Sequence, residues 1–397
     1  MKPSPSKIGI VWSPLSERVG TLEVEKQIIL IASSSCDYVF YIGAIHYFLP
    51  SFSAPPNAFP IISTSVFAQL LRFNRIFSGR FVVFLQSFIS FLFLFVKLLF
   101  LRPRTVIAFT CLFPLPIFLL KSSLKPFTAI AFKILCFVQG KPMLLSSDLC
   151  SQGWNWRKVE IFLRNQIFKY FYRSADKVIC SSPRLSLQLA NIAGFNVDLM
   201  TIIPNGIVSN NLSPLKSYDF TSSKVVNFVF IGRLTHQKNI SDLLDSYVNL
   251  RSFLEYPSEL HVFGSGDLSV DLASHHSHLN YIHFHGHVDD PWSFNLDNVV
   301  VLAPSFWEEP GHVPLEAVEH GFLVLVSTGC SCIDFLPDYI RIRMTFNPEN
   351  IDYLLLDLCS IANLRYLASV YSEVCSSFSV FNSKSFRRSI FMLLSSL

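Results

Sequence analysis

Short apolar runs, each followed by a turn and a helical pattern, recur along this chain of 397 residues. The clearest are Val226–Ile231 and Val299–Ala303, which have strand length and no charged residue. Strands that alternate with helices favour a parallel sheet covered on both faces. Pro, Gly, Ser and Asn concentrate between residues 205 and 224, as is typical of a domain boundary. The sequence therefore predicts an α/β fold with two sheet domains.

In the first domain, residues 1–205, the hydrophobic periodicity predicts strands that alternate with helices. The expected strands are 7–12, 38–42, 105–110 and 142–146. The expected helices are 21–32, 66–101 and 157–174, with an apolar helical hairpin or long helix from 110 to 138. Residues 50–60 are expected to form a proline-rich loop. The second domain is expected to span 206–375, and residues 376–397 to form a last helix.

One strand end in the second domain carries two carboxylates, Glu308 and Glu316. The pattern predicts a loop at 304–312 and a helix that has Pro314 in its first turn and ends at Gly321. A helix N-terminus favours a phosphate, and carboxylates can accept hydrogen bonds from sugar hydroxyls. This geometry suits a nucleotide sugar, although the spacing alone fits an ordinary strand–loop–helix with two surface acids equally well.

A second turn supplies two cations. Arg233 and Lys238 follow the apolar run 226–231 and precede a helical pattern that begins at Ile240. Such a turn aims both side chains past the carboxyl end of a sheet, where open α/β sheets bind ligands. Arg offers a planar fork for phosphate oxygens and Lys a point charge. Together with the two-glutamate loop, this turn predicts a site for a diphosphate.

The two motifs resemble those of the retaining glycosyltransferases of family 4, which have the GT-B architecture. The family's Gly-Arg-Leu…Lys-Asn turn is similar to residues 232–239, and its Ser-x-x-Glu-x-x-Gly-x-x-x-x-Glu-Ala loop to residues 305–317. Further segments that resemble the family, in the same order, are 175–182, 203–207, 260–266 and 281–288. The likeness is specific from about residue 175 to 335 and diffuse before that.

The resemblance implies a GT-B fold, with two Rossmann-like doubly wound domains that face a cleft. Arg233, Lys238 and Glu308 would be catalytic: the cations stabilise the leaving diphosphate, and Glu308 holds hydroxyls of the transferred sugar. Glu316 would hold the ribose. The other implied donor-binding residues are Gly20, Gly232, Gly264, His287, Gly311, His312 and Val313. Asp148 is a candidate for contact with the acceptor, although a helix-cap or loop acid also fits.

Neither a metal nor a cofactor is expected beyond the nucleotide-sugar substrate. The chain has no Asp-x-Asp motif, so a metal-bridged diphosphate is not indicated. His283, His285 and His287 alternate and would share one face of a strand, which is compatible with metal ligands. No carboxylate or cysteine has a matching spacing, however, and a metal site is therefore not predicted.

The first domain is very apolar and cationic. No Asp or Glu lies between Tyr38 and Ser147, whereas ten Lys and Arg residues do. This asymmetry favours an anionic membrane surface or an anionic lipid-linked acceptor as partner, with 66–104 as the membrane-associating segment. Residues 81–101 have the length of a bilayer span but include Gln86 and Lys97. A spanning helix, a helix buried in the sheet domain and an interfacial helix remain alternatives.

We therefore expect a glycosyltransferase that moves a sugar from a nucleotide donor to a glycan or lipid-linked acceptor with retention, in surface polysaccharide or glycolipid synthesis. No secretory signal is expected, so the enzyme would be cytoplasmic and peripherally associated with the inner membrane surface. Nucleic acid is not an expected partner. The alternative is a non-catalytic GT-B subunit that partners an active transferase. Pro310 and Cys330 favour it, because the resembled family has an aromatic residue and a glycine there.

Overall fold

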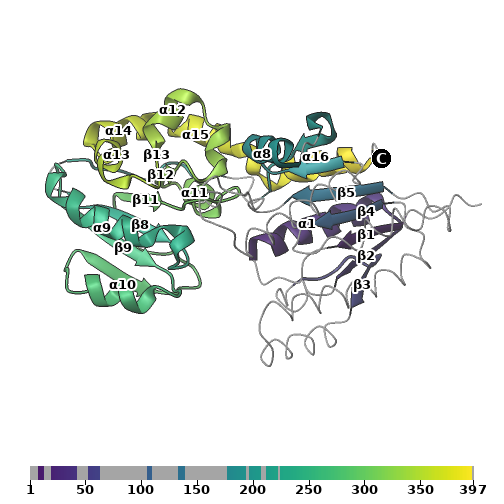
Figure 1. The fold of residues 1–397 in the computed structure, drawn as a ribbon, viewed down its shortest axis with the longest axis horizontal. Helices are drawn as coiled ribbons and strands as arrows, with labels where there is room; N and C mark the ends of the chain where they lie inside the picture. Colours follow the sequence, from purple (N-terminus) through teal and green to yellow (C-terminus); the bar gives the residue numbers. More distant parts are fainter. Residues whose placement is uncertain are drawn as a thin grey trace, which may run out of the picture. The chain divides into compact units, whose positions relative to one another are not determined.

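The structure is a computed structural model that describes residues 8–12, 19–42, 52–62, 105–109, 133–138, 177–193, 196–206, 212–221 and 224–395. The chain divides into two compact units (Figure 1). Unit 1 comprises Met1–Asn205 and Lys384–Leu397, and unit 2 comprises Gly206–Ser383. The expected elements at 66–101, 142–146 and 157–174, the segment 66–104 and Asp148 lie outside the described residues. No described helix is both long and apolar enough to cross a bilayer.

Unit 1 is built on a parallel sheet whose described strands run in the order β3-β2-β1-β4-β5-β6-β7. The strands are β1 (Ile8–Trp12), β2 (Tyr38–Ile42), β3 (Ala58–Ile62), β4 (Thr105–Phe109), β5 (Lys133–Val138), β6 (Lys177–Cys180) and β7 (Met200–Ile202). The described helices are α1 (Val19–Ser35), α8 (Pro183–Ala193) and α16 (Ser383–Ser395), with a 3-10 turn at Val197–Leu199. The order reverses between β1 and β4, which is the doubly wound pattern.

Two expectations for unit 1 are wrong. Residues 133–138, predicted to be helical, instead form strand β5, which pairs with β4 on one side and β6 on the other. Residues 58–60, predicted as loop, begin strand β3 at the edge of the sheet. The cause is the same in both cases. A short apolar run fits a buried parallel strand and a buried helix equally well, and only pairing with strands distant in sequence decides between them.

The core of unit 1 contains residues from α1 and β2 and also from the last helix, α16. Ile28 of α1 and Tyr41 of β2 are fully buried in one cluster with Phe386 and Ile390 of α16. The last helix is therefore part of unit 1. The predicted boundary at residue 376 falls inside α15 (Tyr371–Phe378), which belongs to unit 2, and the chain returns to unit 1 only after Ser383.

Unit 2 has a second parallel sheet, with the strand order β10-β9-β8-β11-β12-β13. The strands are β8 (Val226–Ile231), β9 (Ser258–Phe263), β10 (Ile282–Gly286), β11 (Val299–Ala303), β12 (Leu323–Ser327) and β13 (Thr345–Phe346). The helices are α9 (Ile240–Leu250), α10 (Ser269–His276), α11 (His312–Glu319), α12 (Asp338–Met344), α13 (Ile351–Leu358), α14 (Ile361–Ser369) and α15.

The sheet of unit 2 positions the two motif turns beside each other. Strand β11 is buried at every residue, and α9 buries Ile240, Leu243, Leu244 and Tyr247, which lie on one face at helical spacing. Strands β8 and β11 are hydrogen-bonded neighbours at the point where the strand order reverses. The turn after β8 and the loop after β11 therefore open at the same crevice of the sheet, which is where ligands of such folds bind.

Candidate active site

The two motif turns contact each other directly. The Phe306 N–H donates to the carbonyl oxygen of Gln237 at 3.0 Å, and Gln237 Nε2 donates to the Trp307 carbonyl at 3.2 Å. Lys238 Nζ then forms an ion pair with Glu308 Oε1 at 2.6 Å. Both charged side chains are largely buried, with 17% and 16% of their surface exposed, so water screens this pair less than one on the surface. One predicted cation and one predicted carboxylate thus meet.

A residue in the left-handed conformation directly follows Lys238. Lys238 ends a 3-10 turn (η2, His236–Lys238), and Asn239 follows with φ +55° before α9 begins. Asparagine tolerates this conformation better than most residues. Its Nδ2 also donates to the buried Pro348 carbonyl at 2.8 Å. The junction between the turn and the helix is therefore fixed by the conformation of Asn239 and by its buried hydrogen bond.

Two predicted donor-binding glycines are needed for packing. Gly264, just after β9, has φ +144°, and a Cβ there would overlap the carbonyl oxygen of Gly232. Gly232 in turn lies against the Lys238 side chain, since its own Cβ would be 3.7 Å from Lys238 Cδ. The Gly264 backbone, the Gly232 backbone and the lysine stem form successive layers. A side chain on Gly264 would push this stack apart.

The loop after β11 is fastened to the segment after β12. The Glu308 N–H donates to the Gly329 carbonyl, and the Ser331 N–H donates to the Glu308 carbonyl, both at 3.1 Å. A Cβ on Gly329 would clash with the Phe306 carbonyl, so this close approach requires glycine. Glu308 is thereby fixed by its backbone as well as by Lys238.

Helix α11 starts at the predicted place. Gly311 precedes it with φ +103°, and His312 and Val313 form its first turn. The first N–H groups of any helix lack an intrahelical carbonyl partner, which makes this end a favourable place for an anion. A pocket here is lined by charged and apolar side chains: Phe230, Ile231, Lys238, Ala303, Pro304, Ser305, Glu308, Gly311, His312, Val313, Pro314 and Cys330. Five of the predicted site residues thus share one cavity.

His312 links the two glutamates electrostatically. Its Nδ1 lies 4.0 Å from Glu316 Oε1. Burial lowers the pKa of His312, and the Lys238 cation lowers it further, whereas the carboxylates of Glu316 and Glu308 oppose the shift. The lowered pKa favours the neutral imidazole beside the ion pair, and in that form one ring nitrogen accepts a hydrogen bond while the other donates.

Glu316 accepts a hydrogen bond from a tryptophan that the sequence did not indicate. Trp292 Nε1 donates to Glu316 Oε2 at 3.1 Å, and its ring stacks on His320 with centroids 5.1 Å apart and an interplanar angle of 9°. Trp292 lies between β10 and β11 in a segment without regular periodicity, so no local pattern could have marked it. The Glu316 side chain remains 34% exposed, so its carboxylate can still accept a further hydrogen bond.

The other predicted residues are not gathered into the pocket. Arg233 is exposed, and among the described residues its side chain has no ion pair or hydrogen-bond partner. The side chain of His287 is 73% exposed, and its nearest acid is Asp289 at 4.0 Å. Gly20 lies in the first turn of α1 rather than in a loop, in unit 1.

Comparison with known proteins agrees with this fold. Residues 221–358, which include the pocket, match the family model "Glycosyl transferases group 1". No curated protein matches the sequence. Similar solved structures include the lipopolysaccharide outer core galactosyltransferase WaaB in its apo form (18% identity, TM-score 0.64, 98% of this chain and 100% of that chain covered). Anabaena Alr3699/HepE in complex with UDP is also similar (14% identity, TM-score 0.64, 98% of this chain and 100% of that chain covered). So is WaaG, a glycosyltransferase involved in lipopolysaccharide biosynthesis (13% identity, TM-score 0.55, 94% of this chain and 99% of that chain covered).

At these identities the structural neighbours establish the fold, which is GT-B over nearly the whole chain. The family match covers the part of unit 2 that carries the Lys238–Glu308 pair. Together, the family match and the fold identify a glycosyltransferase.

Proposed function

We propose that this chain transfers a sugar with retention from a nucleoside-diphosphate sugar to a glycan or lipid-linked acceptor. The observation that carries the proposal is the Lys238–Glu308 ion pair beside the start of α11, in one pocket. A diphosphate bound there meets the lysine cation and the N–H groups of His312 and Val313. Arg233, which is exposed in the turn after β8, adds a planar guanidinium that can bind two phosphate oxygens.

Charge stabilisation is the main catalytic contribution of this site. The bond between the anomeric carbon and the diphosphate oxygen breaks, and negative charge accumulates on the leaving group, where Lys238 and Arg233 stabilise it. The acceptor hydroxyl attacks from the same face and passes its proton to the departing phosphate oxygen, so that the configuration is retained. Glu308 holds hydroxyls of the transferred sugar, and Glu316 those of the ribose. Lys238 and Arg233 neutralise the diphosphate charge that a bridging metal ion neutralises in metal-dependent transferases, so transfer needs no metal.

The donor and acceptor classes rest on different observations. A UDP-sugar is the first donor to test, because HepE, which has the same fold, was solved with UDP and with UDP-glucose. A lipid-linked or polysaccharide acceptor is favoured by the lipopolysaccharide transferases among the structural neighbours. The absence of acids from 38 to 147 favours peripheral attachment to an anionic cytoplasmic membrane face.

Purified full-length protein should be screened for thermal stabilisation by UDP, GDP, ADP and their sugars, and then for release of the nucleoside diphosphate. We expect one nucleotide class to raise the melting temperature, and Lys238→Ala and Glu308→Gln each to lower turnover by at least about 10²-fold. Lys224→Ala, an exposed lysine of unit 2 away from the pocket residues, is the control and should behave as wild type. Nucleotide binding without turnover, with or without acceptor lipid, would identify the non-catalytic partner subunit instead.

A further inference from the structure

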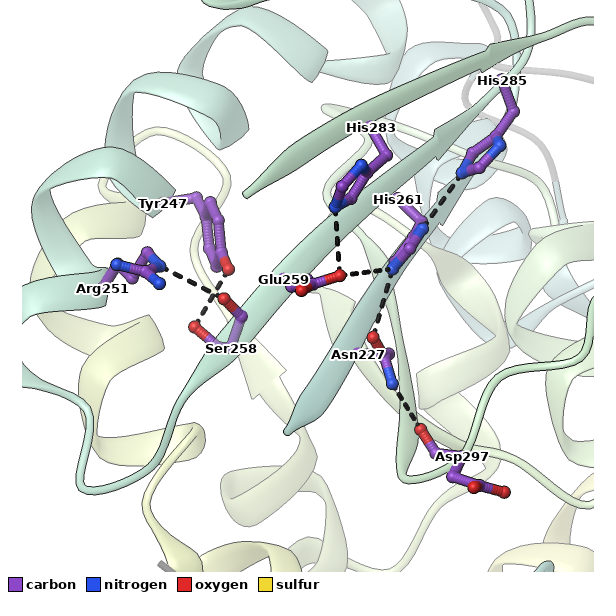
Figure 2. Close-up of polar contacts among 9 residues, drawn as sticks. All are labelled: Asn227, Tyr247, Arg251, Ser258, Glu259, His261, His283, His285 and Asp297. Atoms are coloured by element: carbon purple, nitrogen blue, oxygen red, sulfur yellow. Dashed lines mark hydrogen bonds and ion pairs between the residues drawn. The ribbon is translucent and has the colours of Figure 1, made fainter. Parts of the chain in front are cut away.

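A second cluster of polar side chains lies on one face of β8, β9 and β10, apart from the pocket residues. Strand register pairs Asn227 with Glu259 and His261 with His283, so these four side chains point to the same face of the sheet. Ser258 points to the opposite face, where its hydroxyl meets Tyr247 of α9 at 2.9 Å (Figure 2). The cluster therefore occupies the face that α9 does not cover.

Three side chains of this cluster converge on one point. Glu259 Oε2 lies 3.0 Å from His283 Nε2 and 3.7 Å from His261 Nε2, and all three atoms lie within 4.8 Å of one another (Figure 2). Tetrahedral zinc with bonds of about 2.0–2.1 Å holds its ligand atoms about 3.3–3.4 Å apart. The two Glu259 distances lie within a few tenths of an ångström of that spacing, and the two histidine nitrogens lie within 4.8 Å of each other.

We propose that Glu259, His261 and His283 bind a zinc-class divalent cation that clamps edge strand β10 to β9. Two neutral imidazoles and one carboxylate are a ligand set that zinc uses with water in the fourth position. Glu259 and His283 are 40% and 37% exposed, which leaves an open side for entry and for that water. His261 is only 7% exposed and forms the inner ligand.

The contact with His285 orients the inner ligand whether or not a cation is present, whereas the contact with Asn227 belongs to the cation-free state. His261 Nδ1 lies 3.0 Å from His285 Nε2, and His261 Nε2 lies 3.1 Å from Asn227 Oδ1. Without metal, Nε2–H donates to Asn227 while Nδ1 accepts from His285. When a cation takes Nε2, the proton moves to Nδ1 and the same His285 nitrogen accepts it. A ligand histidine characteristically donates its other ring N–H in this way.

Stacking holds the rings in place beforehand. The His261 ring lies between His283 and His285, with centroids 4.7 and 5.3 Å away and interplanar angles of 21° and 16°. Phe263 then stacks on His285 at 4.2 Å. Because the His261 and His283 rings are nearly parallel, the His283 ring has to turn out of the stack for both nitrogens to reach one cation. The sequence alone did not predict this site, since Glu259 and His261 lie on β9 and His283 on β10, and only the pairing of the two strands brings the three side chains together.

The test uses chelator-treated full-length protein titrated with ZnCl₂ and, as a spectroscopic probe, CoCl₂. We expect one Zn²⁺ per chain by calorimetry and elemental analysis, visible Co²⁺ absorption of tetrahedral type, and a higher melting temperature with Zn²⁺. Glu259→Gln and His283→Gln should each weaken Zn²⁺ binding by more than the roughly 10–100-fold typical of losing an outer contact. His285→Gln, which removes only an outer contact, should fall within that range.

His278→Gln is the matched control, since His278 is exposed in the same unit and outside the cluster; its Zn²⁺ affinity should equal that of wild type. UDP affinity, measured in parallel, should not change in Glu259→Gln, so this test is independent of the proposed transfer reaction. Failure to bind Zn²⁺ at micromolar concentrations overturns the proposal. So does Zn²⁺ binding that survives both Glu259→Gln and His283→Gln, because the ion then lies elsewhere.

Discussion

At the residue scale, the Lys238–Glu308 pair gives the site its chemistry and its first prediction. Lys238 is held at 2.6 Å from the carboxylate, so its ammonium is already positioned before any donor arrives. Lys238→Met keeps the apolar stem against Gly232 and removes only the charge. We expect kcat for sugar transfer to fall by about 10²–10³-fold, the typical loss for one donor to a developing anion. Steady-state kinetics with saturating donor measure this, and an unchanged kcat would exclude Lys238 from leaving-group stabilisation.

Gly264 and Gly286 make a matched pair for testing backbone packing. Both have positive φ, +144° and +71°, but a Cβ at Gly264 overlaps the Gly232 carbonyl, whereas one at Gly286 has no atom within 4 Å. Gly286→Ala should therefore lose only about 1–2 kcal/mol of unfolding free energy through backbone strain. Gly264→Ala should lose substantially more, because a backbone atom has to move. Urea unfolding compares the two, and equal losses would show that the glycine stack is not needed.

His312 predicts a pH dependence of stability. Its folded-state pKa is lowered, chiefly by burial, below the unfolded value of about 6.5. Below pH 6.5 the unfolded chain therefore takes up the proton more readily, and stability is lost as pH falls through the folded pKa. The difference in unfolding free energy between wild type and His312→Gln should shift in favour of the variant from pH 7.5 to 5.5. A difference that is constant with pH would mean that His312 titrates normally.

At the element scale, the sequence predicted unit 2 better than unit 1. Strands β8 and β11 lie where the apolar runs placed them, because each run is bounded by a turn and followed by an amphipathic helix. The same reasoning failed at β5, whose apolar run has no such boundary and becomes a strand only through pairing with β4 and β6. Local periodicity does not contain that information.

The same limit applies to the site. The Lys238 and Glu308 turns were predictable because each follows its own strand end, and neighbouring strand ends meet at one edge of the sheet. The bond from Trp292 to Glu316 and the approach of Glu259 to His283 join residues 24 positions apart, from an irregular segment or a different strand. Contacts of this kind depend on register, and no single motif carries them.

The junction between η2 and α9 can be tested with two substitutions of one residue. Asn239→Gly keeps the left-handed backbone free of strain but removes the buried bond to the Pro348 carbonyl, a loss of about 1–3 kcal/mol for an unsatisfied group. Asn239→Ala loses that bond and adds backbone strain of about 1–2 kcal/mol. Alanine should thus be the less stable variant in chemical denaturation. If the two variants are equally stable, the left-handed geometry is not needed.

At the scale of the whole molecule, the chain leaves unit 1 after Asn205 and returns to it at Lys384. Each unit has its own buried cluster, one around Phe228 and Leu325 and the other around Tyr41 and Phe386. The last helix therefore stabilises the unit that contains the start of the chain. A domain with a separate core can lose stability without its neighbour doing so.

This arrangement predicts that substitutions in α16 act on unit 1 alone. Phe386 is 1% exposed in the unit 1 core, whereas Phe391 on the same helix is 45% exposed. Phe386→Ala should destabilise unit 1 by about 3–5 kcal/mol, and Phe391→Ala should have little effect. Hydrogen exchange resolved by peptide distinguishes the units: exchange should accelerate in peptides from α1 and β2 but not in those from β8 and β11. Equal acceleration in both sets would show that the two cores unfold together, because loss of one buried ring would then destabilise both units.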